Sequence, residues 1–81
     1  MQYDPTNLTP AECELIDWQY DQIGSDFKRP LWAAICAADK GNRDRLALGF
    51  PEQVEAYRRY TGERDYWNDV ITRAGILPET T

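Results

Sequence analysis

Three stretches of this chain begin with a proline and end with a glycine: Pro10 to Gly24, Pro30 to Gly41, and Pro51 to Gly62. Proline suits the first turn of a helix, where its missing N–H leaves no bond unmade, and glycine readily takes the left-handed conformation that ends a helix. The spacing therefore predicts three helices with these bounds. Because helices this short gain most of their stability from packing on one another, it also predicts a helical bundle.

The first of these helices carries the clearest start signal. In Thr9-Pro10-Ala11-Glu12, the threonine side chain can accept from the amide of Glu12 while the glutamate reaches back to the amide of Thr9, which is a capping box. We expect this helix to run from Pro10 to Ile23 and to end at Gly24.

The rest of the chain shows helical periodicity with breaks at glycines. The second helix, from Pro30 to Gly41, is expected to be the central element because its alanines allow close approach of a neighbour. Asn42 is expected to cap a short third helix, unless Gly41 is tolerated internally and the two helices merge. Two more helices are expected, at about Pro51 to Thr61 and Glu63 to Ala74, the last closed by Gly75. The predicted fold is an all-α, compact bundle of four to five short helices.

Eighty-one residues make one small domain, so residues 1–81 are assigned to a single helical domain. Residues 1–8 are expected to form an N-terminal arm that packs through Tyr3 and Leu8, and residues 78–81 a frayed tail. No apolar run approaches the length of about 20 residues that a membrane span needs, and the N-terminus does not resemble a signal peptide. These features favour a cytoplasmic protein that does not enter a membrane.

Histidine is absent, and the two cysteines are Cys13 and Cys36. Two reduced, buried thiols are the simpler interpretation, although one disulfide between them is open. Without histidine, Ser-His triads, Cys-His dyads and ordinary zinc sites lack an essential member. No phosphate-binding loop, calcium loop or nucleophile elbow is present either. The sequence therefore predicts no enzyme activity, no catalytic residues, no cofactor and no metal.

Charge is unevenly distributed along the chain. Before Lys28 there are six acidic side chains and no basic one, whereas the remainder has nine basic and eight acidic side chains, giving the net charge of −5. Helical spacing places Glu14, Asp17 and Asp21 on one ridge, which we expect to be exposed. These three acids, with Trp18 as an aromatic anchor, are the predicted partner-binding residues. The alternative is a solvated helix face without a partner.

Two basic segments are interpreted as structural. In the segment from Tyr57 to Tyr60, Arg58 or Arg59 is expected to pair with Glu55 at helical spacing. Basic residues at positions 40, 43 and 45 are interleaved with aspartates at 39 and 44. Direct nucleic-acid binding is therefore not expected.

A longer sequence pattern suggests a biological setting for the chain. It comprises Leu31-Trp32-Ala33-Ala34-Ile35, Ala38-Asp39, Asn42, Arg45-Leu46, Leu48-Gly49-Phe50-Pro51-Glu52, Val54-Glu55-Ala56-Tyr57 and Tyr60. Over about residues 31 to 67, with Tyr66-Trp67 as a further aromatic pair, this resembles a group of small phage and prophage proteins of uncharacterised function. The shared residues are of the helix-packing and helix-capping kind, so the resemblance implies a shared helical fold and no transferable functional residue.

The leading hypothesis is a small acidic phage- or prophage-encoded accessory protein in the bacterial cytoplasm. It would bind a host protein or protein complex without catalysis and inhibit a nucleic-acid-handling or defence complex, such as a CRISPR complex. A self-associating virion structural or assembly component is the alternative, and a homo-oligomer is compatible with it. A nucleic-acid-binding regulator is a third hypothesis, for which no basic recognition helix is identified.

Overall fold

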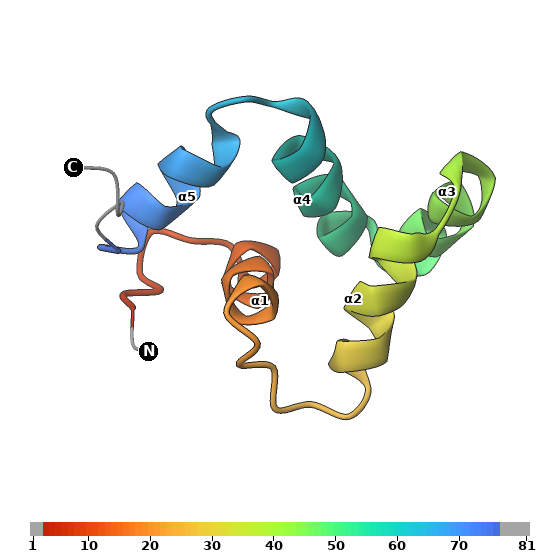
Figure 1. Ribbon diagram of the computed structural model, residues 1–81, viewed down its shortest axis with the longest axis horizontal. Helices are drawn as coiled ribbons and strands as arrows, with labels where there is room; N and C mark the ends of the chain where they lie inside the picture. Colours follow the sequence, from red (N-terminus) through yellow and green to blue (C-terminus); the bar gives the residue numbers. More distant parts are fainter. Residues whose placement is uncertain (1–2, 77–81) are drawn as a thin grey trace.

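Five helices follow one another along residues 3–76, which are the residues that the computed structural model describes. They are α1 (Pro10–Gln19), α2 (Lys28–Ala37), α3 (Lys40–Gly49), α4 (Pro51–Gly62) and α5 (Tyr66–Arg73) (Figure 1). No strand occurs within these residues. The predicted all-α fold is confirmed. The tail predicted for residues 78–81 lies outside the described part of the chain.

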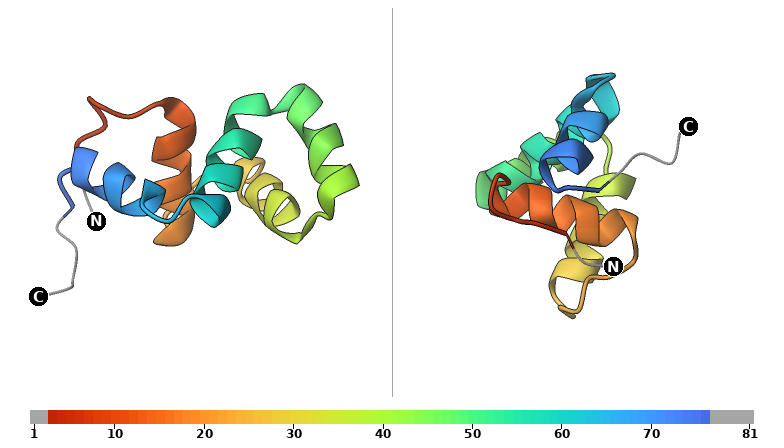
Figure 2. Two further views of the ribbon diagram at one scale, coloured as in Figure 1. Left: turned by 90° about the horizontal axis from the view of Figure 1, so that it is seen from above. Right: turned by 90° about the vertical axis from the view of Figure 1, so that its left-hand side faces the viewer.

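The central element is α4, because it packs against each of the other four helices. Figure 2 shows α1 and α5 at one end of the molecule and α2 and α3 at the other, with α4 between them. The expectation that the second helix would be central is therefore wrong. We call the two ends the α1–α5 end and the α2–α3 end.

Two apolar clusters form the core. The larger lies at the α1–α5 end and includes Leu15 and Ile16 of α1, Val70 of α5, and Trp32, which α2 contributes. The smaller lies at the α2–α3 end and has only three buried members: Leu31, Ile35 and Val54. Tyr57 of α4 packs against both clusters and so joins them.

The capping box at the start of α1 is confirmed: Thr9 Oγ1 accepts from the Glu12 amide at 3.1 Å, and Glu12 Oε1 accepts from the Thr9 amide at 3.0 Å. The predicted N-terminal arm also packs as expected, since Tyr3 and Leu8 are half-buried against the larger cluster.

The predicted end of the first helix is wrong. The helix ends at Gln19, and Asp21 takes the left-handed conformation with φ 55°. Its amide donates to Trp18 O and the next amide, of Gln22, donates to Asp17 O, which is a Schellman motif. Aspartate tolerates this conformation better than most residues, so the helix ends before Gly24 is reached.

The boundary between α2 and α3 also differs from expectation. The chain leaves the helix at Ala38, whose ψ of 144° is extended, and the side chain of Asp39 then caps α3 by accepting from the Asn42 amide at 2.8 Å. Asn42 is therefore not the cap, and Gly41 lies inside α3 instead of ending α2. Because the extended conformation of Ala38 ends α2 and Asp39 then caps α3, the two helices do not merge.

Candidate protein-binding surfaces

Glu14, a predicted partner-binding residue, is buried, with 9% of the residue exposed. Its carboxylate accepts from Trp32 Nε1 at 3.1 Å and from Gln53 Nε2 at 3.4 Å, and Lys28 Nζ lies 3.4 Å away. The expectation that Glu14 belongs to an exposed ridge is therefore wrong. The carboxylate is turned inward because α2 and α4 supply the donors that replace water.

The other three predicted residues do not share one exposed face. Asp17 is half-buried and accepts from the Tyr3 hydroxyl at 2.9 Å. Trp18 is half-buried and stacks on Trp32, with ring centroids 5.9 Å apart. Only Asp21 is exposed, and it lies beyond the end of α1. A binding role for these residues stays a prediction, but the ridge that suggested it does not form.

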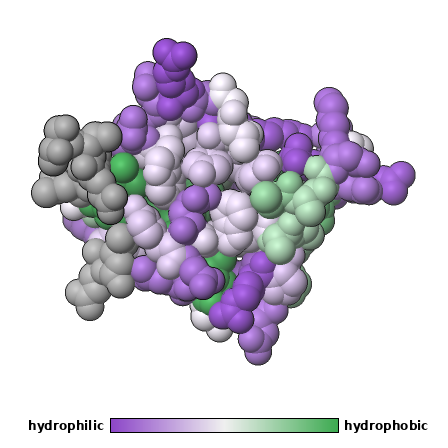
Figure 3. All heavy atoms as spheres, viewed as in Figure 1, coloured by the Kyte–Doolittle hydropathy of each residue, from purple (hydrophilic) through white to green (hydrophobic). Residues whose placement is uncertain are grey.

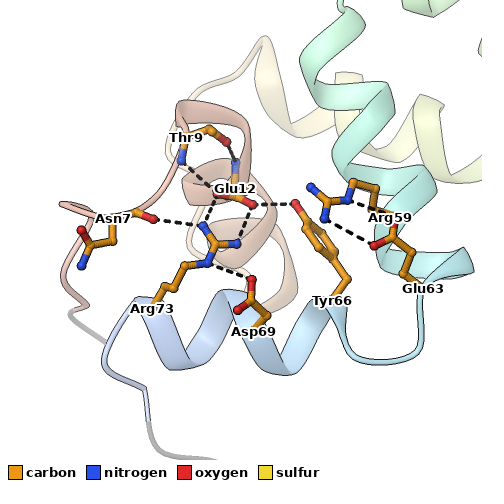
Figure 4. Close-up of polar contacts among 8 residues, drawn as sticks. All are labelled: Asn7, Thr9, Glu12, Arg59, Glu63, Tyr66, Asp69 and Arg73. Atoms are coloured by element: carbon orange, nitrogen blue, oxygen red, sulfur yellow. Dashed lines mark hydrogen bonds and ion pairs between the residues drawn. The ribbon is translucent and has the colours of Figure 1, made fainter.

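A network around Glu12 joins α1 to α5 (Figure 4). Glu12 is buried, with 5% of the residue exposed. Its carboxylate accepts from both terminal nitrogens of Arg73 at 2.9 and 2.8 Å and from the Tyr66 hydroxyl at 2.9 Å. Arg73 also donates to Asp69 at 2.9 Å and to Asn7 O at 3.0 Å. Arg73 therefore ties the N-terminal arm, α1 and α5 together.

The network fixes the ionisation of its members. The hydrogen bonds from Arg73 lower the pKa of Glu12 to about 2, against the opposing effect of burial. Burial, followed by the hydrogen bond to Glu12, raises the pKa of Tyr66 well above its usual value. At neutral pH, Glu12 is therefore ionised and Tyr66 is a neutral hydrogen-bond donor. These protonation states stabilise the contact between α1 and α5.

Sequence reasoning gave Glu12 only its capping role and did not identify Arg73 or Tyr66 as its partners. Those residues lie 61 and 54 positions away in the chain. No local pattern signals such a pairing.

Beside the network, a groove of about 330 Å³ lies between α1 and α4. The N-terminal turn of α1 and the first part of α4 form its sides, and Tyr66 of α5 lies at it as well. The groove is lined by Thr9, Pro10, Ala11, Glu12, Glu52, Glu55, Ala56, Arg59 and Tyr66. We call it the α1–α4 groove.

The charges of the α1–α4 groove are incompletely paired. The expected pairing of Glu55 with Arg58 or Arg59 is wrong: Arg58 pairs with Asp44 of α3, and Arg59 pairs with Glu63 at 3.1 Å. Glu52 and Glu55 are both exposed, and within residues 3–76 neither forms an ion pair. The groove thus presents two carboxylates that no cation of the described chain neutralises.

A second surface lies at the α2–α3 end and is apolar. Leu48 is 87% exposed and Phe27 is 62% exposed, and α3 has no buried residue. A shallow hollow of about 470 Å³ between the helices is lined by Ala34, Ala37, Ala38, Asn42, Arg45 and Leu46. Figure 3 shows exposed alanines of α2 as a pale-green patch.

The basic residues near this end are largely engaged by the chain itself. Arg43 donates to Ile35 O at 3.2 Å and to Ala38 O at 2.6 Å, and Lys40 pairs with Asp44 at 2.9 Å. The Arg43 hydrogen bonds close the turn between α2 and α3, and the Lys40–Asp44 pair lies within α3. Both give a structural reason for this small basic cluster.

Cys13 is half-buried and Cys36 is exposed, and neither forms a disulfide. The expectation that both thiols are buried is wrong for Cys36, which is exposed although its sulfur accepts from the Tyr57 hydroxyl at 3.9 Å. Within residues 3–76, no cluster of three acidic or cysteine side chains could hold a metal ion, and no helix is long and apolar enough to cross a membrane.

A scan against protein-family models gave no match, and neither the curated proteins nor the solved structures gave one. The resemblance to small phage proteins therefore stays a prediction.

Proposed function

We propose that this protein acts without catalysis, by binding a basic surface of another protein through the α1–α4 groove. The observation that carries the proposal is the pair of unneutralised carboxylates, Glu52 and Glu55, beside an apolar groove floor. An apolar centre with a charged rim is the usual anatomy of a protein interface. The network around Glu12 supports the proposal, because it holds α1 and α5 firmly beside the groove.

The partner class follows from charge. A net charge of −5 and a groove lined by two glutamates that form no ion pair within the described chain, Glu52 and Glu55, favour association with a cationic surface. Surfaces that normally hold nucleic-acid phosphates have that character. In the phage or prophage setting that the resemblance implies, the partner would be a host nucleic-acid-handling or defence complex, and the protein would be its inhibitor.

The test compares three baits in lysate of the bacterial host. Wild type, a Glu52→Lys/Glu55→Lys variant and an Asp26→Lys/Asp65→Lys variant are immobilised, and retained proteins are identified by mass spectrometry. The second variant changes net charge equally at exposed acids outside the α1–α4 groove. We expect one basic protein or complex that wild type and the Asp26/Asp65 variant retain and the groove variant loses. A partner that all three baits retain would contradict binding through the groove.

Self-association is a second candidate, favoured by the exposed Leu48 and Phe27. Leu48 projects from α3, which has no buried residue, and Phe27 lies just before α2. Large apolar side chains exposed in this way are typical of a surface that a partner covers. A virion structural component would use such a surface for contact between copies. Sedimentation equilibrium over a wide concentration range tests this: a mass that stays at the monomer value excludes it.

A further inference from the structure

We propose that the α1–α4 groove receives one lysine or arginine side chain of the partner, with its cationic head at Glu52 and Glu55. This inference rests on the proposed function and names the chemistry of the group that enters the groove. Three features support it: the size of the groove, its apolar floor, and the pairing of the arginines of α4 with other carboxylates.

The groove has room for one long side chain. Its volume of about 330 Å³ lies at the lower end of the range of about 300–1,000 Å³ for pockets that hold small-molecule ligands. Ala11 and Ala56, which are 2% and 4% exposed, line it from α1 and α4. Because alanine side chains are short, they leave space between the two helices where larger residues would fill it.

The lining matches an amphipathic side chain. The apolar part consists of Pro10, Ala11, Ala56 and the Tyr66 ring. Lysine and arginine cover such surfaces with their methylene stems while the charged head stays at the solvent. A purely apolar side chain would fill the floor but would leave both carboxylates without a partner.

The arrangement of α4 provides the charge. Glu52 and Glu55 are three residues apart on one helix, so their side chains are neighbours on its surface. The two arginines that follow them are drawn away, Arg58 to Asp44 and Arg59 to Glu63. Two adjacent carboxylates without a cation repel each other, and a bound cation relieves that repulsion.

The other end of the groove disfavours an anion. The Arg59 guanidinium lies over the Tyr66 ring, 4.3 Å from its centroid, and its charge is already paired with Glu63. Glu12, which also lines the groove, is neutralised by Arg73. An entering carboxylate would therefore meet two unpaired glutamates and no unpaired cation among the lining residues.

The experiment uses three acetylated, amidated tripeptides, Gly-Lys-Gly, Gly-Arg-Gly and Gly-norleucine-Gly. Each is titrated into the isotope-labelled full chain, and the amide signals of Ala11, Ala56 and Tyr66 are followed by NMR. We expect saturable shifts at these amides with the lysine or arginine peptide, at millimolar concentrations, and weaker effects with norleucine, which has the stem without the charge.

Variants then assign the effect to the two glutamates. Glu52→Gln/Glu55→Gln should weaken binding of the cationic peptide about tenfold, whereas Asp26→Asn/Asp65→Asn should leave it unchanged. Absence of shifts at the groove amides, equal binding of norleucine, or equal binding by the Gln variant would each overturn the inference.

The result is separable from the test of the proposed function. If the peptides do not bind but the groove variant still loses a protein partner from lysate, the inference fails and the proposed function stands. If the peptides bind as expected but every bait retains the same proteins, the proposed function fails.

Discussion

The α1–α5 end combines apolar packing with a buried ion pair, whereas the α2–α3 end has three buried apolar side chains, an exposed ion pair between Arg58 and Asp44, and apolar side chains that face solvent. At the first end, Glu12 has every acceptor position used by Arg73, Tyr66 or Thr9. At the second, Leu48 is 87% exposed. Removing one member of a buried charge network leaves the others without partners and lowers the free energy of unfolding sharply. Truncating a side chain in a small apolar cluster lowers it in proportion to the buried surface that is lost. The two ends should therefore respond differently to mutation.

The difference bears on binding as well. The α1–α4 groove lies beside the more constrained end, where its walls keep their positions without a partner, and a preformed site loses less entropy on binding. The apolar α2–α3 end has fewer buried apolar side chains than the α1–α5 end, and regions with few buried apolar contacts are those that open locally. The first surface suits recognition of one side chain, and the second suits burial against a broad apolar face.

The largest expected effect comes from Arg73→Met, which retains the stem but leaves Glu12 buried without its cation. Removing one member of a buried pair is destabilising by about 3–5 kcal/mol, a large share of the roughly 4–12 kcal/mol expected for a chain of this size. Urea denaturation followed by circular dichroism measures the loss. The Glu12→Gln/Arg73→Met double variant should recover part of it. A loss below about 1 kcal/mol in the single variant would mean that the pair does not hold the α1–α5 end.

At the opposite end, Ile35→Ala is expected to destabilise by about 3–4 kcal/mol, because Ile35 is fully buried and the site has few neighbours to collapse inward. The effect should be local. Amide hydrogen exchange in α3 should accelerate more than exchange in α5. Ile16→Ala, in the larger cluster, is the matched control and should affect both ends. Equal acceleration in α3 and α5 by Ile35→Ala would show that the two ends unfold as one unit.

Acidification probes the α1–α5 end. The pKa of Glu12 is lowered from 4.5 to about 2, so the unfolded state binds more protons and stability rises with pH in this range. The contribution of about 3 kcal/mol is complete above pH 5 and is lost as the pH falls toward 2. Urea titrations across this window measure it. In Arg73→Met the pKa of Glu12 is no longer held down, so the stability gap to wild type should narrow in acid. A gap that is constant with pH would contradict this assignment.

The sequence predicted those elements whose signals are local. The capping box of Thr9 and Glu12, the start of α4 at Pro51 and the close of α5 at Gly75 each depend on residues within a few positions. Gly24 failed as a helix end because a competing residue, Asp21, adopts the left-handed conformation first.

The candidate sites were less predictable because they depend on distant partners. Periodicity alone predicts that Glu14 is exposed. Its carboxylate is buried because Trp32 and Gln53, which lie 18 and 39 residues away in the chain, donate hydrogen bonds to it. The α1–α4 groove likewise arises from how two helices pack. Even the local prediction for Glu55 failed, since Arg58 pairs with Asp44 of α3 and Arg59 pairs with Glu63, four residues further along the chain.

The ends of α1 and α5 allow a finer comparison. Like α1, α5 ends in a Schellman motif, in which the amides of Gly75 and Ile76 donate to Thr72 O and Ile71 O. Gly75 ends α5 with φ 78°, and Asp21 ends α1 with φ 55°. Among residues 3–76, no atom beyond the chain neighbours lies within 4 Å of a Cβ added at Gly75, so Gly75→Ala should destabilise by about 1 kcal/mol through backbone strain. Asp21→Gly should stabilise by roughly 0.5 kcal/mol, since relief of strain is partly offset by the larger entropy of the unfolded chain. Thermal denaturation resolves both, and a stabilising Gly75→Ala would contradict the left-handed assignment.

The smallest expected effect on the monomer comes from Leu48→Ser at the α2–α3 end. Because Leu48 is 87% exposed, its removal takes away almost no buried surface, and the stability of the dilute protein should change by less than about 0.5 kcal/mol. The same change removes the large exposed apolar side chain of α3, so it should abolish any association of copies through this end. Sedimentation of wild type and variant at equal concentration separates the two effects. A marked loss of stability in the dilute variant would mean that Leu48 is covered in solution. The contrast between the α1–α5 end and an exposed, apolar α2–α3 end would then not hold for the isolated chain.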